Sequence, residues 1–538
     1  MNITYDAKSF LLDNKRIWIV AGEVHYFRHP ADEWRQVLLR AKRAGLNAIS
    51  TYVPWNFHET REGIFDFYGD KDLARYIDLI GEMGMYAILR PGPYICSEWD
   101  GGGIPAWLCA KPVRRFREDD PVYMDAVERW FDKLLPIISA RQVTRGGPVI
   151  LIQNENEYPG GWDESMRRYI KKINTIFKRH GIDVPILACN VHRATKTEVQ
   201  INCTMDERDQ FFDPDMILTY NSHVDVEPVY HLKSKQPNAP LFVTEFWCGQ
   251  PVYWGKRIDY WPHHLDQARA AYEYASAGAQ VCYYMFEGGT NFGFWGGNNI
   301  ATSYASSYPV GEGGKLTEKY YVLRPFNLFS NYFGEYLADS VERTDKANIQ
   351  YPDGIRLIVR ECSKGSMAFI STADKRKEIP LTLASGKSVK VFLGEVAATV
   401  IPIGLEVFDN VIVDHSNLTL LARNEAKKVI ILFGVAGTEG VISINGKEES
   451  LLVCRRKVLH KQIDGVNVII TDEEMARRCW IVDDSIVFGP DFVGEMDCNG
   501  SLELKISDGT PEVVYLDAQG HPVCCHFSYK EKIFKTPE

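Results

Sequence analysis

Short apolar runs alternate with amphipathic segments over the first 340 residues of the chain. In the amphipathic segments, apolar residues recur three or four positions apart, which places them on one face of a helix. Segments with this spacing contain Trp34, Val37, Leu38 and Ala41; Leu73, Ile77 and Ile80; and Val127, Trp130, Phe131 and Leu134. The apolar runs have the length of strands and cover residues 17–24, 47–54, 86–91, 149–153, 185–189, 216–220, 241–245 and 280–286. The alternation predicts eight strands connected by helices.

Eight strands that alternate with helices over about 330 residues predict an α/β fold of the (β/α)8 TIM-barrel type, here over residues 1–335. A doubly wound open sheet is the rival fold. That fold usually carries a glycine-rich phosphate-binding turn after its first strand, and Gly22-Glu23-Val24-His25 is not such a turn. The barrel is therefore the preferred prediction.

The pattern changes after about residue 340, where helical periodicity fades and short strands separated by turns follow. Four dipeptides are typical of tight hairpin turns: Asn445-Gly446, Asp464-Gly465, Asn499-Gly500 and Asp508-Gly509. We expect all-β domains after the barrel, a β-rich domain over residues 345–425 and a β-sandwich-like domain over residues 426–538. Three roles stay open for them: supporting the barrel, binding carbohydrate, or forming contacts in a homo-oligomer.

Composition and charge exclude several classes of protein. The formal net charge of −10 argues against nucleic acid as a partner, because that binding depends on clustered Lys and Arg. No run reaches the roughly 18 apolar residues of a membrane span, so no membrane partner is expected. The first residues do not resemble a signal peptide, so we expect a cytoplasmic protein. The twelve cysteines form no CxxC pair, which favours reduced thiols over a zinc site or a disulfide framework.

Candidate chemistry stands after the predicted strands, because a TIM barrel carries its catalytic residues at the C-terminal strand ends. Carboxylates, amides and tryptophans dominate there: Glu23, Tyr52, Trp55, Asn56, Glu59, Glu98, Trp99, Asp100, Asn154, Glu155, Asn156, Glu157, Tyr158, Asn221, His223, Glu245, Trp247, Glu287 and Asn291. No Lys stands at a strand end, and no His cluster has metal-ligand spacing. Paired carboxyls beside aromatic rings suit the cleavage of a glycosidic bond, which needs no cofactor.

Five segments of the barrel resemble glycoside hydrolase family 35, the β-galactosidase family. They are residues 146–158 (GGPVILIQNENEY), 90–99 (RPGPYICSEW), 102–108 (GGIPAWL), 51–59 (TYVPWNFHE) and 288–293 (GGTNFG). The resemblance covers roughly residues 5–330. It implies a retaining, exo-acting β-glycosidase that works by double displacement on an oligosaccharide or other glycoside.

The resemblance also implies roles for two glutamates, Glu157 as the general acid/base and Glu245 as the nucleophile. We expect their carboxyls about 5 to 5.5 Å apart, the separation that suits retention. Glu155 is the rival acid, because the strand period of two puts it on the same side as Glu157. The charge of Glu245 is expected to raise the proton affinity of Glu157.

The sugar-binding positions match the family in part. Tyr52, Cys96, Ser97, Glu98 and Asn156 stand where relatives contact the terminal sugar, and Tyr304 keeps the first tyrosine of the family's TSYDYDAP motif. Three positions depart: Trp247 replaces the usual tyrosine after the nucleophile, Glu287 replaces a frequent histidine, and Ser306 replaces the second tyrosine in TSYASSYP. We assign Trp247 and Glu287 to substrate binding. The alternative for Glu287 is a paired carboxylate at the barrel rim, and Tyr308 is a substitute for the lost tyrosine if its loop shifts.

These departures leave the sugar open, because a site that binds one hydroxyl epimer rejects the other strongly. Three alternatives remain: an exo-acting β-galactosidase, a β-glucoside-active hydrolase or transglycosylase that transfers glucose to β-linked gluco-oligosaccharides, and an enzyme for another sugar. A non-catalytic carbohydrate-binding protein is a hypothesis from a different class. It would be expected to have lost one of the two glutamates, and both are present.

Overall fold

The computed structural model describes residues 1–158, 164–189, 215–249, 251–256, 262–297, 299–304, 307–374, 377–507, 512–525 and 533–535. The chain divides into two compact units. The first contains residues 1–42, 46–262 and 279–317, and the second contains residues 43–45, 263–278 and 318–538.

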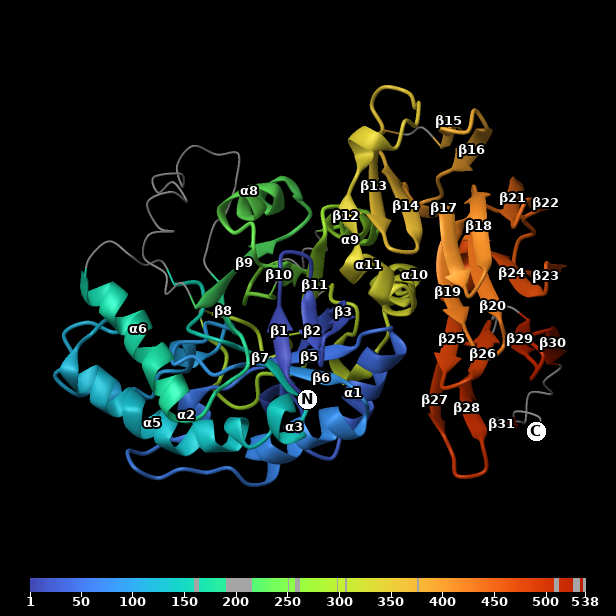
Figure 1. The fold of residues 1–538 in the computed structure, drawn as a ribbon. Coiled ribbons are helices and arrows are strands. Elements are labelled where there is room, and N and C mark those ends of the chain that lie inside the picture. Colours follow the sequence, from blue (N-terminus) through green and yellow to red (C-terminus); the bar gives the residue numbers. More distant parts are fainter. Residues whose placement is uncertain are drawn as a thin grey trace. The chain divides into compact units, whose positions relative to one another are not determined.

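Eight parallel strands form a closed barrel in the first unit (Figure 1). In order around the barrel they are β4 (Val20–Val24), β5 (Ala48–Tyr52), β6 (Tyr86–Arg90), β7 (Val149–Gln153), β8 (Ile186–Cys189), β9 (Met216–Ser222), β10 (Leu241–Trp247) and β11 (Ala279–Glu287). Every residue of β7 is buried, as expected for a parallel strand with both faces covered. The eight strands coincide with the eight apolar runs, so the predicted TIM barrel is confirmed and the open sheet is excluded.

Helices follow the barrel strands along the chain, and several cover the outside of the strands in Figure 1. In this unit they are α1 (Trp34–Arg43), α2 (Trp55–His58), α3 (Leu73–Glu82), α4 (Ala106–Cys109), α5 (Pro121–Ser139), α6 (Glu164–Arg179) and α8 (Glu227–Lys235). The three helices predicted from apolar spacing are α1, α3 and α5, and Val37, Ile77 and Val127 are buried on their inner faces. Helix α5 begins at Pro121, after Asp120 caps it by accepting from the Tyr123 amide at 3.1 Å.

A small antiparallel sheet precedes the barrel, made of β1 (Ile3–Tyr5), β2 (Phe10–Leu12) and β3 (Lys15–Ile17). The second unit contains the helices α9 (His264–Ser276), α10 (Glu318–Tyr332), α11 (Gly334–Asp339) and α12 (Glu473–Arg477). Among the described residues, no helix combines the length and the apolar character that a membrane crossing needs.

The rest of the second unit consists of β-sheets, so the predicted all-β region after the barrel is confirmed. A seven-stranded sheet has the order β12 (Val341–Glu342), β13 (Arg356–Cys362), β14 (Gly365–Ser371), β17 (Ala398–Phe408), β18 (Val411–Ser416), β21 (Glu439–Ile444) and β22 (Lys447–Leu452). The smaller sheets are β15 (Glu378–Thr382) with β16 (Ser388–Phe392); β19 (Thr419–Asn424), β20 (Val429–Gly434), β24 (Val466–Asp472) and β23 (Val458–Ile463); β25 (Cys479–Val482), β26 (Ser485–Phe488), β29 (Val513–Leu516) and β30 (Pro522–Cys525); and β27 (Phe492–Met496), β28 (Ser501–Lys505) and β31 (Ile533–Lys535).

Two of the predicted hairpin turns have the backbone that their sequences favour. Asn445 and Gly446 both have positive φ, at 49° and 78°, and connect β21 to β22. Asp464 and Gly465 also both have positive φ, at 49° and 79°, and connect β23 to β24. Positive φ at both central positions is the requirement of a type I′ turn, which Asn-Gly and Asp-Gly meet at little cost. Asp508 and Gly509 lie outside the described residues.

Candidate active site

A cavity of about 560 Å³ is lined by residues at the C-terminal ends of barrel strands and in the loops that follow them. This is the end of a TIM barrel where catalysis takes place. Eight of the ten predicted site residues line the cavity: Cys96, Ser97, Glu98, Asn156, Glu157, Glu245, Trp247 and Tyr304. The structure therefore brings together side chains that are separated by up to about 200 positions in the sequence.

Glu245, near the end of β10, is surrounded by hydrogen-bond donors. Its Oε1 accepts from Arg90 Nη2 at 2.5 Å and lies 2.7 Å from the Tyr52 hydroxyl. Its Oε2 accepts from Trp247 Nε1 at 3.0 Å. Donors of this kind stabilise the carboxylate form. The indole of Trp247 thus supplies a donor to the nucleophile candidate.

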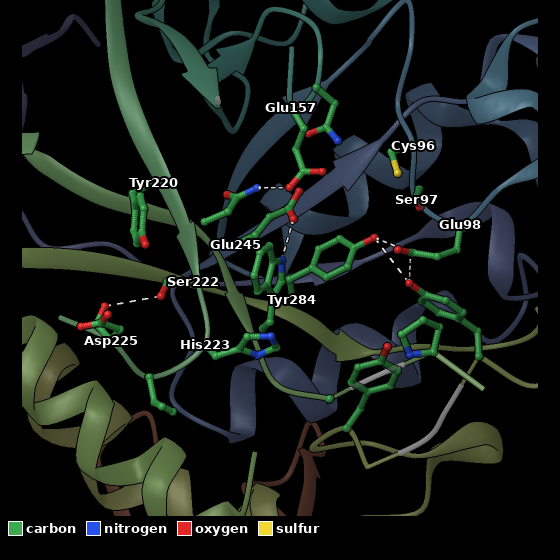
Figure 2. A pocket seen from close by; sticks show the side chains of 18 of the residues that line it. Cys96, Ser97, Glu98, Glu157, Tyr220, Ser222, His223, Asp225, Glu245 and Tyr284 are labelled. Carbon is green, nitrogen blue, oxygen red and sulfur yellow. Dashed lines mark hydrogen bonds between the residues drawn. The ribbon is translucent and has the colours of Figure 1, made fainter. Parts of the chain in front are cut away.

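Glu157, which follows β7, has a different environment. Asn221 Nδ2 donates to its Oε1 at 3.1 Å, and Figure 2 shows its carboxyl group pointing toward that of Glu245. Burial, followed by the negative charge of Glu245, raises the pKa of Glu157 to about 7. Burial and the neighbouring charge therefore let Glu157 keep a proton near neutral pH. The expected separation of about 5 to 5.5 Å between the two carboxyl groups stays a prediction.

Cys96, Ser97 and Glu98 line the cavity from the loop after β6, and all three have positive φ, between 46° and 54°. This backbone is costly for residues other than glycine and turns the segment toward the cavity. Glu98 Oε2 accepts from the hydroxyls of Tyr304 and Tyr284, the latter at 3.0 Å (Figure 2). Buried oxygen acceptors of this kind are suited to fix the hydroxyl groups of a sugar.

Two of the predicted substrate-binding residues are not among those that line the cavity. Tyr52 is buried at the end of β5, where its hydroxyl lies 2.6 Å from Asn156 Oδ1 as well as near Glu245. It contacts the side chains of Asn156 and Glu245 and is not among the residues that line the cavity. Glu287 is buried at the end of β11 and accepts from Arg40 Nη1 at 3.3 Å. This pairing agrees with the alternative interpretation of Glu287, a paired carboxylate at the barrel rim.

Two residues that form hydrogen bonds with the glutamates of the site, Arg90 and Tyr284, were not predicted. Arg90, the last residue of β6, connects Glu245 to Glu23 and Asn156. A lone Arg at the end of an apolar strand was the available signal. Tyr284 lines the cavity, but it lies in a run whose apolar character favoured core packing.

Tyr308 lines the cavity and its ring lies 5.8 Å from that of Tyr304. It is therefore placed where a substitute for the missing tyrosine would be needed. Ser306, at the position of that tyrosine, lies outside the described residues. Within the described residues, no group of three His, Cys, Asp or Glu side chains has a metal-binding arrangement.

Comparison with known proteins identifies the sequence family of the barrel. Residues 9–329 match the model of "Glycosyl hydrolases family 35". "Beta-galactosidase" of Bos taurus is 38% identical over 343 residues, which cover 60% of this chain and 49% of that protein. "Beta-galactosidase-1-like protein 3" of Mus musculus is 35% identical over 332 residues, which cover 59% and 47%. The chain spans about half the length of the curated relatives it matches.

Proposed function

The chain belongs to glycosyl hydrolase family 35, and we propose that it is a retaining β-glycosidase that removes terminal β-linked galactose from oligosaccharides and other glycosides. The carboxyl pair carries this proposal. Glu157 and Glu245 line one cavity, and burial together with the charge of Glu245 raises the pKa of Glu157 to about 7. Arg90 and Trp247 donate hydrogen bonds to the two carboxylate oxygens of Glu245. The matching relatives from Bos taurus and Felis catus are named beta-galactosidase.

In the first step, a carboxylate oxygen of Glu245 attacks the anomeric carbon while the bond to the leaving oxygen breaks. Glu157 donates its proton to that oxygen, so the leaving group departs as an alcohol. The product is a glycosyl ester on Glu245, in which the negative charge of Glu245 is lost.

In the second step, Glu157 acts as the base. Its pKa falls once the charge of Glu245 has been removed, because that charge was one of the causes of the raised value. The Glu157 carboxylate takes a proton from water, the hydroxyl attacks the anomeric carbon, and Glu245 leaves as a carboxylate. Two inversions return the β configuration.

The test compares 4-nitrophenyl β-galactoside with 4-nitrophenyl β-glucoside on the parent chain, Glu157→Gln and Glu245→Gln. We expect the galactoside to react faster, with β-galactose as the first anomer seen by NMR. Glu245→Gln should lose at least about 10³-fold in kcat. A 2-deoxy-2-fluorogalactoside should add its sugar mass to the parent and not to Glu245→Gln. An α-anomer formed first would contradict the retaining mechanism, and a faster glucoside would contradict the sugar.

A further inference from the structure

Arg117 and Glu155 form an ion pair next to the segment that carries Glu157, and neither residue lines the cavity. Arg117 Nε lies 3.2 Å from both carboxylate oxygens of Glu155, and its Nη2 donates to Oε2 at 2.8 Å. The same Nη2 donates to the backbone oxygen of Asn156 at 2.6 Å and lies 3.5 Å from that of Glu157. One guanidinium group therefore contacts three consecutive residues.

The backbone of this segment is strained. Glu155 has φ of 60° and Glu157 has φ of 42°, both in the left-handed region that favours glycine. A residue with this backbone is costly and persists only where the surroundings hold it in place. The contacts from Arg117 are suited to that task, because they join the side chain of Glu155 to the carbonyls of the next two residues.

The ion pair is itself held by aromatic residues. The Tyr169 hydroxyl donates to Glu155 Oε1 at 2.6 Å, and the Tyr158 hydroxyl donates to the Arg117 backbone oxygen at 2.7 Å. The guanidinium carbon lies 3.9 Å from the centre of the Tyr94 ring. A planar guanidinium stacks on a ring while it donates along its edge, which a lysine ammonium cannot do.

We propose that Arg117 and Glu155 are positioning residues that hold the Glu157 carboxyl where it can donate its proton to the leaving oxygen. This proposal rests on the proposed function. It predicts a selective defect, because only the steps that use Glu157 as acid or base depend on the position of its carboxyl. Attack by Glu245 does not require the ion pair.

The test uses two leaving groups on Arg117→Met. The kcat/KM of a glycosidase reports the steps up to formation of the glycosyl-enzyme. Phenyl β-galactoside needs a proton on its leaving oxygen, whereas 2,4-dinitrophenyl β-galactoside does not. We expect kcat/KM to fall by about 100-fold for the phenyl substrate and by less than about fivefold for the dinitrophenyl substrate. Azide should raise kcat on the dinitrophenyl substrate, because it replaces water without needing a base.

Arg115→Met is the matched control. Arg115 lies in the same loop, its side chain is 66% exposed, and it pairs with Glu118 at 3.2 Å. We expect it to keep both kcat/KM values. Arg117→Lys should recover only part of the phenyl activity, and Glu155→Gln combined with Arg117→Met should lose little more than Arg117→Met alone.

Equal losses on the two substrates, or no loss on the phenyl substrate, would overturn the positioning role. Failure of the proposed function has different signatures, because the parent chain would then release dinitrophenol from neither the galactoside nor the glucoside, or would release it faster from the glucoside. A thermal unfolding curve for each variant separates a misplaced carboxyl from a protein that has not folded.

Discussion

Glu157 holds its proton because of its surroundings. A glutamate in water is ionised at neutral pH, but burial and the charge of Glu245 raise the pKa of this one to about 7. The hydrogen bond that Asn221 donates to Oε1 lowers the pKa, but this effect is smaller than the increase caused by burial. The raised value suits the role of general acid that we propose for Glu157, because a general acid works best when its pKa lies near the working pH.

The pH profile of kcat/KM follows from this value. The acid form of Glu157 is present below about pH 7, so kcat/KM for phenyl β-galactoside should fall as pH rises through 7, approaching tenfold for each pH unit above it. The profile for the dinitrophenyl substrate should lack this fall. In Glu157→Gln the alkaline fall should disappear for the phenyl substrate, and its persistence there would show that another group titrates.

Glu287 gives a prediction for stability. Burial raises the pKa of its carboxyl from 4.5 to about 8, despite the opposing charge of Arg40. Between these pH values the folded state holds a proton that the unfolded chain releases, so the free energy of unfolding falls as pH rises through this window. Glu287→Gln removes the titration. We expect the variant to gain about 3 kcal/mol relative to the parent between pH 5 and pH 8, since each pKa unit corresponds to about 1.4 kcal/mol.

Urea unfolding at four pH values measures this gain, and Glu227→Gln, an exposed glutamate of α8, is the control. If the free energy of unfolding differed between Glu287→Gln and the parent by the same amount at all four pH values, the raised pKa of Glu287 would be contradicted.

The sequence predicted site residues best where they follow a strand within a family motif. Glu157 and Glu98 were found in this way, Glu245 was found at the end of a predicted strand, and all three line the cavity. Arg90 and Tyr284 were missed because their roles depend on partners from other strands, which a pattern along one strand does not reveal. The same limit left the role of Glu287 undecided between substrate binding and a paired carboxylate, since its partner Arg40 is 247 positions away in the sequence.

At the scale of elements, the segment after β11 is positioned by close backbone packing. A Cβ on Gly288 would lie 1.4 Å from the backbone oxygen of Tyr304. The Tyr304 amide donates to the Gly289 oxygen at 2.9 Å, so the two stretches run against each other. This packing places the Tyr304 hydroxyl on Glu98.

Gly288→Ala should therefore displace Tyr304. We expect a loss of about 2 kcal/mol in stability, the usual effect of overpacking, together with a lower kcat/KM for the galactoside. Thermal unfolding and initial rates measure the two effects. Gly311→Ala is the control, because its Cβ would meet no atom closer than 3.6 Å. Full activity in a stable Gly288→Ala protein would show that the Tyr304 contact is dispensable.

The barrel strands were predictable because each is a continuous apolar run, whereas the pairing of the later strands was not. Strand β18 pairs with β21, although β19 and β20 lie between them in the sequence and belong to a different sheet. The seven-stranded sheet consequently takes strands from both sides of residue 425, where we expected a domain boundary. Local turn signals such as Asn445-Gly446 locate hairpins between consecutive strands. They do not show which strands pair when other strands, such as β19 and β20, lie between them in the sequence.

At the scale of the molecule, the chain enters the second unit before the barrel is complete. Helix α9 belongs to that unit and connects β10 to β11 along the chain. Arg360, in β13, donates to the Ser276 oxygen at the end of α9 at 3.1 Å. It also donates to the oxygen and the hydroxyl of Ser340, both at 2.8 Å. Its side chain thus fixes the helix within the second unit.

Arg360→Met tests whether the two units unfold together. Removing three hydrogen bonds leaves two buried carbonyls without this donor, which should cost about 3 kcal/mol. Because α9 leads directly into β11, whose residues Tyr284 and Glu287 lie at or near the site, loosening the helix should also end catalysis. We expect activity and circular dichroism to be lost in one transition, at a lower temperature than in the parent. Arg343→Met, which removes a partly exposed pair with Glu361, should leave that temperature unchanged within about a degree. If activity survives above the temperature at which the sheets melt, the barrel is stable without the second unit.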